Sequence, residues 1–97
     1  MDNNNVSGDR RLFLTIRNRD EVVFEGAVKA LSSWNQVGKF DVLPLHANFI
    51  ALIEKGLTIH ELGGTKKDME FDMAILHVIQ NKVDIYLGVQ KLLPGQS

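Results

Sequence analysis

Cysteine is absent from this chain of 97 residues, so neither a disulfide nor a thiolate metal site can form. No apolar run approaches the roughly 20 residues of a membrane-spanning helix, so we expect no direct membrane insertion. Neither charge dominates, because 11 basic residues are balanced by 12 acidic residues scattered along the chain. Nucleic-acid binding is therefore not expected, since it needs a basic patch that displaces counterions from phosphates.

The first ten residues are polar and lack the apolar core of a signal peptide, which makes a cytoplasmic location the default expectation. We expect residues 1–10 to be a disordered tail, because they carry almost no apolar side chain that could be buried. The remaining length suits one domain over residues 11–90, followed by a flexible C-terminus over residues 91–97.

Apolar and polar residues alternate through most of residues 11–90, which is the pattern of half-buried strands. The apolar spacing slips after Gly26, which predicts a bulge or bend there, and Lys55–Gly56 predicts a hinge. Strands are expected over residues 12–17, 22–32, 39–43, 49–54 and 56–62, with further alternation from Met69 to Val78 and from Val83 to Leu87. The pattern predicts an all-β fold, an antiparallel β-sandwich or flattened barrel of about 8–10 short strands.

The three histidines do not predict a metal or catalytic site. They are His46, His60 and His77, and none has a second histidine or a cysteine at metal-ligand spacing. His60 and His77 occupy outward positions of alternating strands, so we expect solvated side chains. His46 follows the Pro44–Leu45 corner, where an imidazole can hydrogen-bond loop carbonyls and hold the corner closed.

No other residues predict a catalytic or cofactor-binding site. Ser32 and Ser33 lack the elbow motif of a catalytic serine, so a Ser-His-Asp arrangement is unsupported. Gly63–Gly64 reads as a hairpin turn, because the lysine and helix start of a phosphate loop do not follow it. Trp34 is expected in the core or at an interface, since no basic cluster accompanies it. We therefore expect no catalytic residues, no cofactor and no metal.

The stretch from Gly38 to Leu52 is the most informative part of the chain. It alternates as a strand, stops at Pro44, turns over His46 and Ala47, and resumes as an apolar strand. This stretch resembles a corner in the N-terminal β-sandwich of the epsilon subunit of F-type ATP synthases, which is the mitochondrial delta subunit. There the pattern is roughly G-E-F-G, two hydrophobic residues, P-G-H-A-P and two more hydrophobic residues.

Other segments resemble the same domain, in order and at suitable spacing. They are Val23–Gly26, Gly56–Ile59, Ile75–Val78 and Asn81–Val83. The chain also departs from the family's pattern: Lys39 replaces an acidic residue, Asp41 and Leu45 replace glycines, Asn48 replaces a proline, and Asp72–Ala74 replaces Ser-Gly-Gly. Each lost glycine requires a backbone that tolerates a Cβ. The resemblance is therefore to a divergent member of the family.

The resemblance implies a non-catalytic rotor subunit of the central stalk. Such a sandwich is held by the gamma subunit and rests on the polar loops of the membrane c-ring, so it couples rotation to ion translocation. The implied gamma or ring contacts are Gln36, Val37, Gly38, Lys39 and His46, and the implied structural corner is Pro44, His46 and Ala47. The lysine at position 39 predicts an acidic or neutral ring loop opposite it.

The family's C-terminal inhibitory helices have no counterpart in this sequence, so the resemblance implies a coupling subunit without that brake, peripheral on the inner face of the energy-transducing membrane. Two other function classes stay open. A free-standing β-sandwich interaction module would use a strand edge or an apolar face to bind another protein. A small enzyme or ligand-binding barrel would need a concave pocket with converging polar groups, and the sequence nominates no residues for one.

Overall fold

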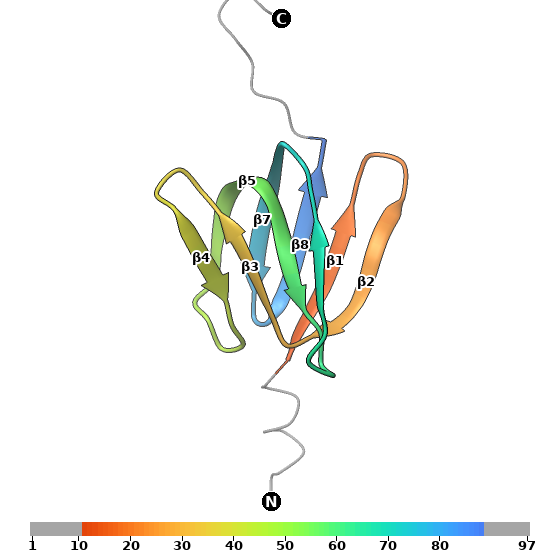
Figure 1. Cartoon of the computed structure of the whole chain (residues 1–97), viewed down its shortest axis with the longest axis vertical. Helices are drawn as coiled ribbons and strands as arrows, with labels where there is room; N and C mark the ends of the chain where they lie inside the picture. The colour runs from red at the N-terminus through yellow and green to blue at the C-terminus, as the bar shows by residue number, and fades with distance from the viewer. Residues whose placement is uncertain (1–10, 89–97) are drawn as a thin grey trace, which may run out of the picture.

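The computed structural model describes residues 11–88, which form a layered β-fold (Figure 1). The tail expected over residues 1–10 and the C-terminus expected over residues 91–97 lie outside the described residues, as do residues 89–90 of the expected domain. The described residues contain eight strands and no helix, which confirms the all-β class. The strands are β1 Leu12–Arg17, β2 Val22–Val28, β3 Ala30–Trp34, β4 Lys39–Val42, β5 Phe49–His60, β6 Lys66–Met69, β7 Met73–Ile79 and β8 Lys82–Leu87.

The strands form a continuous sheet in the order β2-β1-β8-β7-β5-β3-β4, with β6 also paired to β5. The first half of β5 pairs with β7, whereas its second half pairs with β3 and β6. We call β2, β1, β8, β7 and the first half of β5 sheet I, and β4, β3, the second half of β5 and β6 sheet II. Every pair is antiparallel, as the alternating pattern predicts, except β1 with β8, which run parallel.

β5 passes from sheet I to sheet II at Lys55 and Gly56, whose φ angles are 70° and 104°. A Cβ on Gly56 would clash with the carbonyl oxygen of Met69, so glycine is required there. The Ser33 hydroxyl donates a hydrogen bond to the carbonyl oxygen of Gly56 at 2.8 Å. The expected hinge is therefore present, but residues 49–60 form one continuous strand rather than the two strands that the sequence predicts.

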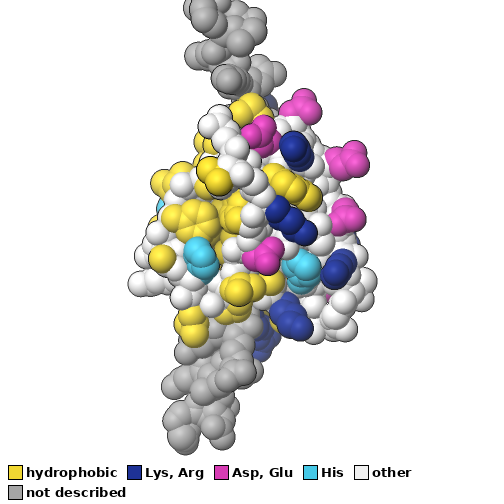
Figure 2. Space-filling view, turned by 60° about the vertical axis from the view of Figure 1, so that its left-hand side comes forward, with side chains coloured by type: hydrophobic (Ala, Val, Ile, Leu, Met, Phe, Trp, Pro, Cys, Tyr) yellow, Lys and Arg dark blue, Asp and Glu magenta, His cyan; other side chains and the backbone are white. Residues whose placement is uncertain are grey.

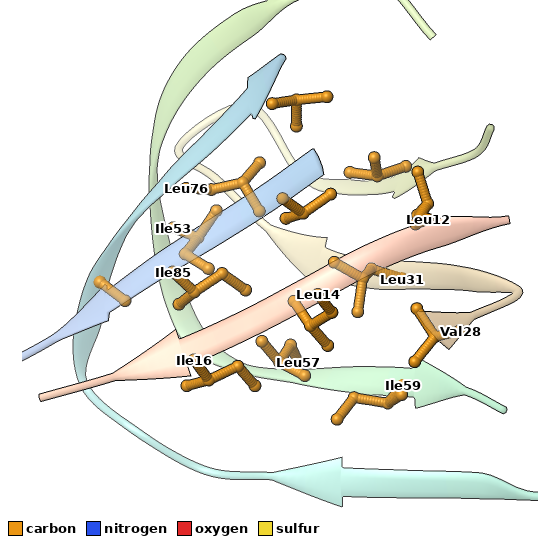
Figure 3. Close-up of a cluster of buried hydrophobic side chains, with 14 residues drawn as sticks. Leu12, Leu14, Ile16, Val28, Leu31, Ile53, Leu57, Ile59, Leu76 and Ile85 are labelled. Atoms are coloured by element: carbon orange, nitrogen blue, oxygen red, sulfur yellow. The ribbon is translucent and has the colours of Figure 1, made fainter. Parts of the chain in front are cut away.

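The core lies between the two sheets, where alternate residues of facing strands meet (Figure 3). The chain's clearest alternation, in β1, places Leu12, Leu14 and Ile16 in this core with no exposed surface. The other fully or almost fully buried members are Val28, Leu31, Val42, Ile53, Leu57, Ile59, Ala74, Leu76, Val78, Val83 and Ile85. Burying a large apolar side chain contributes about 1.5–3 kcal/mol, so these residues hold the two layers together.

The strand expected over residues 22–32 is two strands. β2 ends at Val28 and β3 begins at Ala30, because the chain reverses at Lys29 and enters the other sheet. The backbone amide of Lys29 donates to the carbonyl oxygen of His60 at 2.8 Å. Of the bulge or bend expected after Gly26, the bend is present, at Lys29, and the bulge is not. Gly26 pairs in register with Leu14, and the irregularity of β2 lies instead opposite the Ile16–Arg17 step.

The turns gather at two opposite ends of the molecule (Figure 1). The corner end holds Lys29 and the connections over residues 43–48, 61–65 and 80–81, and the hairpin end holds those over residues 18–21, 35–38 and 70–72. Gln80 and Asn81 both have positive φ, 49° and 67°, as a tight two-residue hairpin requires. The left-handed backbone expected at Asn81 is thus confirmed.

Candidate functional site

The outer face of sheet I is apolar along part of its width. Leu52, Ile75 and Tyr86 lie side by side across β5, β7 and β8, because Leu52 pairs with Ile75 and Ile75 pairs with Tyr86. We call these three residues the apolar row. They point away from the core, since their neighbours along each strand are more deeply buried. Other exposed large apolar residues on the strands of sheet I are Phe13, Val22, Val23, Ile50 and Ile79.

The apolar row exposes surface that a protein usually buries. Leu52 and Tyr86 are 42% and 40% exposed. Single exposed apolar residues are common, but a contiguous apolar face marks an interaction site. Arg17 borders the row: its guanidinium carbon lies 5.5 Å from the centroid of the Tyr86 ring, and its Nη2 donates to Asp84 Oδ1 at 3.3 Å. This face suits a protein partner with apolar groups.

The outer face of sheet II is polar by contrast. Its register places these side chains on one face: Ser32, Trp34, Lys39, Asp41, Thr58, His60, Lys66 and Asp68. Thr58 Oγ1 donates to Asp68 Oδ1 at 2.7 Å, which links β5 to β6. Figure 2, which brings the β4 side of the molecule forward, shows hydrophobic side chains toward its left and charged side chains toward its right. The two outer faces therefore differ in the partners they favour.

Three side chains on the polar face form a hydrogen-bonded cluster that the sequence does not predict. The Ser32 hydroxyl donates to Asp41 Oδ1 at 2.6 Å and lies 2.9 Å from Nε2 of His60. Because the hydroxyl proton is given to Asp41, His60 acts as the donor toward Ser32 Oγ. His60 occupies an outward position of a strand, as expected, but it is half-buried and bonded to Ser32 rather than fully solvated.

The order of these bonds differs from that of a catalytic triad. In a triad the serine hydroxyl donates to the imidazole, and the carboxylate binds the other imidazole nitrogen. Here the carboxylate of Asp41 receives the proton of Ser32 directly, and Ser32 itself is only 5% exposed. The arrangement fixes the side chains of Asp41 and His60 on the sheet surface instead of activating the serine.

The hairpin end presents the predicted contact residues 36–38 at the tip of the β3–β4 hairpin. Asn35 Oδ1 accepts hydrogen bonds from the amides of Val37 and Gly38 at 2.8 and 3.1 Å, which fixes the turn. Val37 is 95% exposed at this tip. The turn therefore displays an apolar side chain on a backbone that is already ordered.

Lys39 begins β4 directly behind this tip. Its Nζ lies 6.0 Å from the centroid of the Trp34 ring, and the two residues are paired across β3 and β4. Trp34, expected in the core or at an interface, is half-buried on the outer face of sheet II. The cation of Lys39 is thus held near an aromatic surface at the hairpin end.

The corner predicted from the sequence comprises Pro44, His46 and Ala47, and it lies at the corner end. The imidazole of His46 packs against the Phe49 ring at 5.2 Å, and its Nδ1 lies 3.3 Å from the carbonyl oxygen of Ala47. Leu45 has a φ of 68°, the left-handed conformation that favours glycine. Its amide donates to Asn81 Oδ1 at 2.7 Å, which ties the corner to the β7–β8 turn.

The five residues expected at the gamma or ring contact do not form one patch. Gln36, Val37, Gly38 and Lys39 lie at the hairpin end, and His46 lies at the corner end beyond the whole length of β4 (Figure 1). A flat partner surface at one end of the molecule cannot reach both sets.

Part of the cluster of Ser32, Asp41 and His60 could have been predicted from the sequence. Ser32 and Asp41 lie on the two arms of a hairpin, so a correct hairpin register would have paired them. His60 joins them only through the long-range pairing of β3 with β5, which no local pattern reveals. Among residues 11–88, no three histidine, cysteine, aspartate or glutamate side chains are placed to hold a metal ion.

Within the part of the chain that the structure describes, no helix is long and apolar enough to span a membrane. Comparison with protein-family models and with curated protein sequences finds no match. Comparison with solved structures identifies chains with a similar fold.

A chain of the Euglena gracilis mitochondrial ATP synthase, from a cryo-EM structure containing OSCP, F1 and the c-ring, matches with a TM-score of 0.75. Sequence identity is 23%, over 80% of this chain and 51% of that chain. A chain from a cryo-EM structure of the central stalk and c-ring of the Tetrahymena thermophila mitochondrial ATP synthase matches with a TM-score of 0.62 and 11% identity, over 78% of this chain and 62% of that chain. This chain thus spans less than two thirds of each, and the likeness is one of fold to chains of mitochondrial ATP synthase assemblies.

Proposed function

We propose that this chain is a non-catalytic rotor subunit of an F-type ATP synthase, equivalent to the N-terminal sandwich of the epsilon subunit (the mitochondrial delta subunit). Two observations support the proposal. The fold is similar to chains of mitochondrial ATP synthase structures that contain the c-ring. The segments around Pro44, Gly56 and Asn81 resemble the same domain. Such a subunit couples rotation of gamma to the ion-translocating ring.

The fold match carries the rotor role, and the apolar row carries the assignment of the gamma contact. A rotor subunit has to be fastened firmly to gamma, and burial of apolar surface is the main favourable term in protein association. Leu52, Ile75 and Tyr86 offer such surface on a hydrogen-bonded sheet. The ladders of sheet I make this face stiff, so force applied to it is passed on with little deformation. We assign the gamma contact to this face.

The ring contact is assigned to the hairpin end. Val37 and Lys39 are exposed there, and Asn35 holds the turn in shape. A preorganised turn loses little conformational entropy when it docks against the polar loops of a membrane ring. His46 lies at the other end of β4 and is left out of this contact.

The test is affinity purification of the full chain, tagged at its C-terminus, from the cells that make it. Gamma and c-ring subunits are identified in the eluate by mass spectrometry. Leu52→Lys places a charge in the apolar row and should lose both partners. Leu62→Lys makes the same change at a residue 50% exposed in the β5–β6 connection, and it should keep both. Circular dichroism checks that both variants are folded.

The outcomes separate the two parts of the proposal. Absence of gamma and c-ring subunits with the unaltered chain overturns the rotor role and favours the free-standing interaction module. Retention of gamma by Leu52→Lys overturns the assignment of the apolar row and leaves the rotor role standing.

A further inference from the structure

A groove of about 780 Å³ lies at the corner end, between the β4–β5 connection and the β5–β6 turn. Its volume falls within the range of binding pockets for small ligands or short peptide segments, roughly 300–1,000 Å³. It is lined by Lys29, Ala30, Asp41, Leu43, Pro44, Leu45, His60, Glu61, Gly64 and Lys66. The groove is separate from the apolar row of sheet I, since its walls come from the strands and turns of sheet II.

One wall of the groove is apolar and accessible. It consists of Leu43, Pro44 and Leu45, whose leucine side chains are 51% and 73% exposed. The amide of Leu45 is held by Asn81 Oδ1 at 2.7 Å, so this wall is fixed in place although it belongs to a loop. An apolar side chain from a ligand would remove this surface from water.

The unpaired charge in the groove is positive on balance, because two lysines and one carboxylate of its lining have no ion pair among residues 11–88. Asp41 accepts the Ser32 hydroxyl at 2.6 Å, and Glu61 Oε2 lies 3.6 Å from the Nζ of Lys67. In contrast, Lys29 and Lys66 form no ion pair with any residue among positions 11–88. Both lie next to His60: Lys66 of β6 pairs with His60, and Lys29, which directly precedes β3, donates its amide to the carbonyl oxygen of His60 at 2.8 Å. Glu61 is thus paired with a cation, whereas the carboxylate of Asp41 and the two ammonium groups have no oppositely charged partner among residues 11–88.

The polar floor of the groove is preorganised. Ser32, which is 5% exposed, holds Asp41 and His60 together from beneath. A site whose side chains are already fixed loses less entropy on binding than one built from mobile side chains. The buried hydroxyl of Ser32 therefore serves to hold the side chains of Asp41 and His60 in position on the outer face of sheet II.

From these observations we infer that the groove binds a short acidic segment of a partner protein. One apolar side chain of the segment lies against Leu43–Leu45, and its carboxylates pair with Lys29 and Lys66. An inorganic anion would leave the apolar wall uncovered, and a basic segment would meet two unpaired ammonium groups. The inference does not depend on the rotor role, because it concerns a different surface.

The test uses the full chain labelled with ¹⁵N and three synthetic peptides: acetyl-Asp-Leu-Asp-amide, acetyl-Asp-Ser-Asp-amide and acetyl-Lys-Leu-Lys-amide. Amide chemical shifts are followed during titration. The acidic leucine peptide should shift the amides of residues 29–30, 43–45 and 60–66, with a dissociation constant of about 1 mM or tighter. The serine peptide should bind several-fold more weakly, and the lysine peptide should not shift these amides.

Variants locate the contacts. The double change Lys29→Gln with Lys66→Gln should weaken binding of the acidic leucine peptide by about tenfold, because two exposed charge pairs are lost. The control, Lys55→Gln with Lys82→Gln, removes the same charge away from the groove and should leave binding unchanged. Equal shifts with all three peptides, no shifts with any, or full competition by inorganic phosphate would overturn the inference.

Discussion

The side-chain oxygen of Asn48 accepts a hydrogen bond from the backbone amide of Gln80 at 2.8 Å, across 32 residues of sequence. A second bond runs in the opposite direction, from the amide of Leu45 to Asn81 Oδ1 at 2.7 Å. The β4–β5 connection and the β7–β8 turn therefore hold each other at the corner end. Asn48 stands where the resembled family has a proline, which has no side-chain acceptor for the amide of Gln80.

Replacement of Asn48 should loosen this tie. Asn48→Ala removes the acceptor, and because the bond is exposed to solvent the loss should be modest, about 0.5–1 kcal/mol in the free energy of unfolding. Asn48→Asp keeps a side-chain oxygen and should lose less. Urea unfolding followed by circular dichroism measures both. Equal stability of Asn48→Ala and the unaltered chain would show that water replaces the bond at no cost.

Gly56→Ala should be among the most damaging single changes in the chain. The φ of 104° disfavours a side chain, and the new Cβ would meet the backbone of Met69 in β6. We expect a loss of about 3 kcal/mol or more in the free energy of unfolding, because both backbone segments have to move. Gly63→Ala is the matched control, since a Cβ there meets nothing within 4 Å. Thermal unfolding of the two variants should differ clearly, and similar midpoints would contradict the tight approach of β5 and β6.

Leu45→Asn should stabilise the protein. Leu45 adopts a φ of 68° with its side chain 73% exposed, so little burial is lost while the left-handed strain is relieved. Asparagine tolerates this conformation better than leucine, and the expected gain is about 0.5–1 kcal/mol. Leu43→Asn makes the same change at a residue without positive φ and should destabilise slightly. A loss of stability in Leu45→Asn, measured by urea unfolding, would mean that the leucine contributes more packing than its exposure indicates.

Ser32→Ala should cost more than removal of an exposed hydroxyl. The change leaves Asp41 and His60 without their shared partner beneath the sheet surface, and we expect a loss of about 1–2 kcal/mol. Thr58→Val is the comparison, because it removes a hydroxyl that bonds Asp68 at 2.7 Å in an exposed position. Chemical unfolding of both variants gives the difference. A larger loss for Thr58→Val would contradict the structural role assigned to Ser32.

Lys39→Glu should weaken assembly with the partner ring if the hairpin end is the ring contact. The substitution reverses the charge near Trp34 without changing the buried core, since Lys39 is exposed. The defect should grow at low salt, because screening of exposed charges decreases there. Recovery of c-ring subunits with the tagged chain, compared at low and high salt, measures it. Assembly that is unchanged at either salt concentration would remove Lys39 from the interface.

The local sequence pattern was enough to predict much of the fold. The alternation in residues 12–17 correctly placed Leu12, Leu14 and Ile16 in the core, because strand side chains point to opposite faces with a period of two. The hinge at Lys55–Gly56 and the left-handed Asn81 were also readable, since glycine and asparagine adopt conformations that other residues avoid. The all-β class followed from the same local rules.

Pairing between distant strands was settled only in three dimensions. Residues 49–54 are apolar on both faces, so alternation could not show that Ile53 is buried while Leu52 joins Ile75 and Tyr86 on the outside. Likewise, Ser32 lies next to His60 only because β3 pairs with the second half of β5. The length of β4 keeps the turn at residues 35–38 apart from the corner at residues 44–47. The period of a strand is a property of neighbouring residues, whereas its register depends on which partner buries the most apolar surface, and that is decided by the folded chain as a whole.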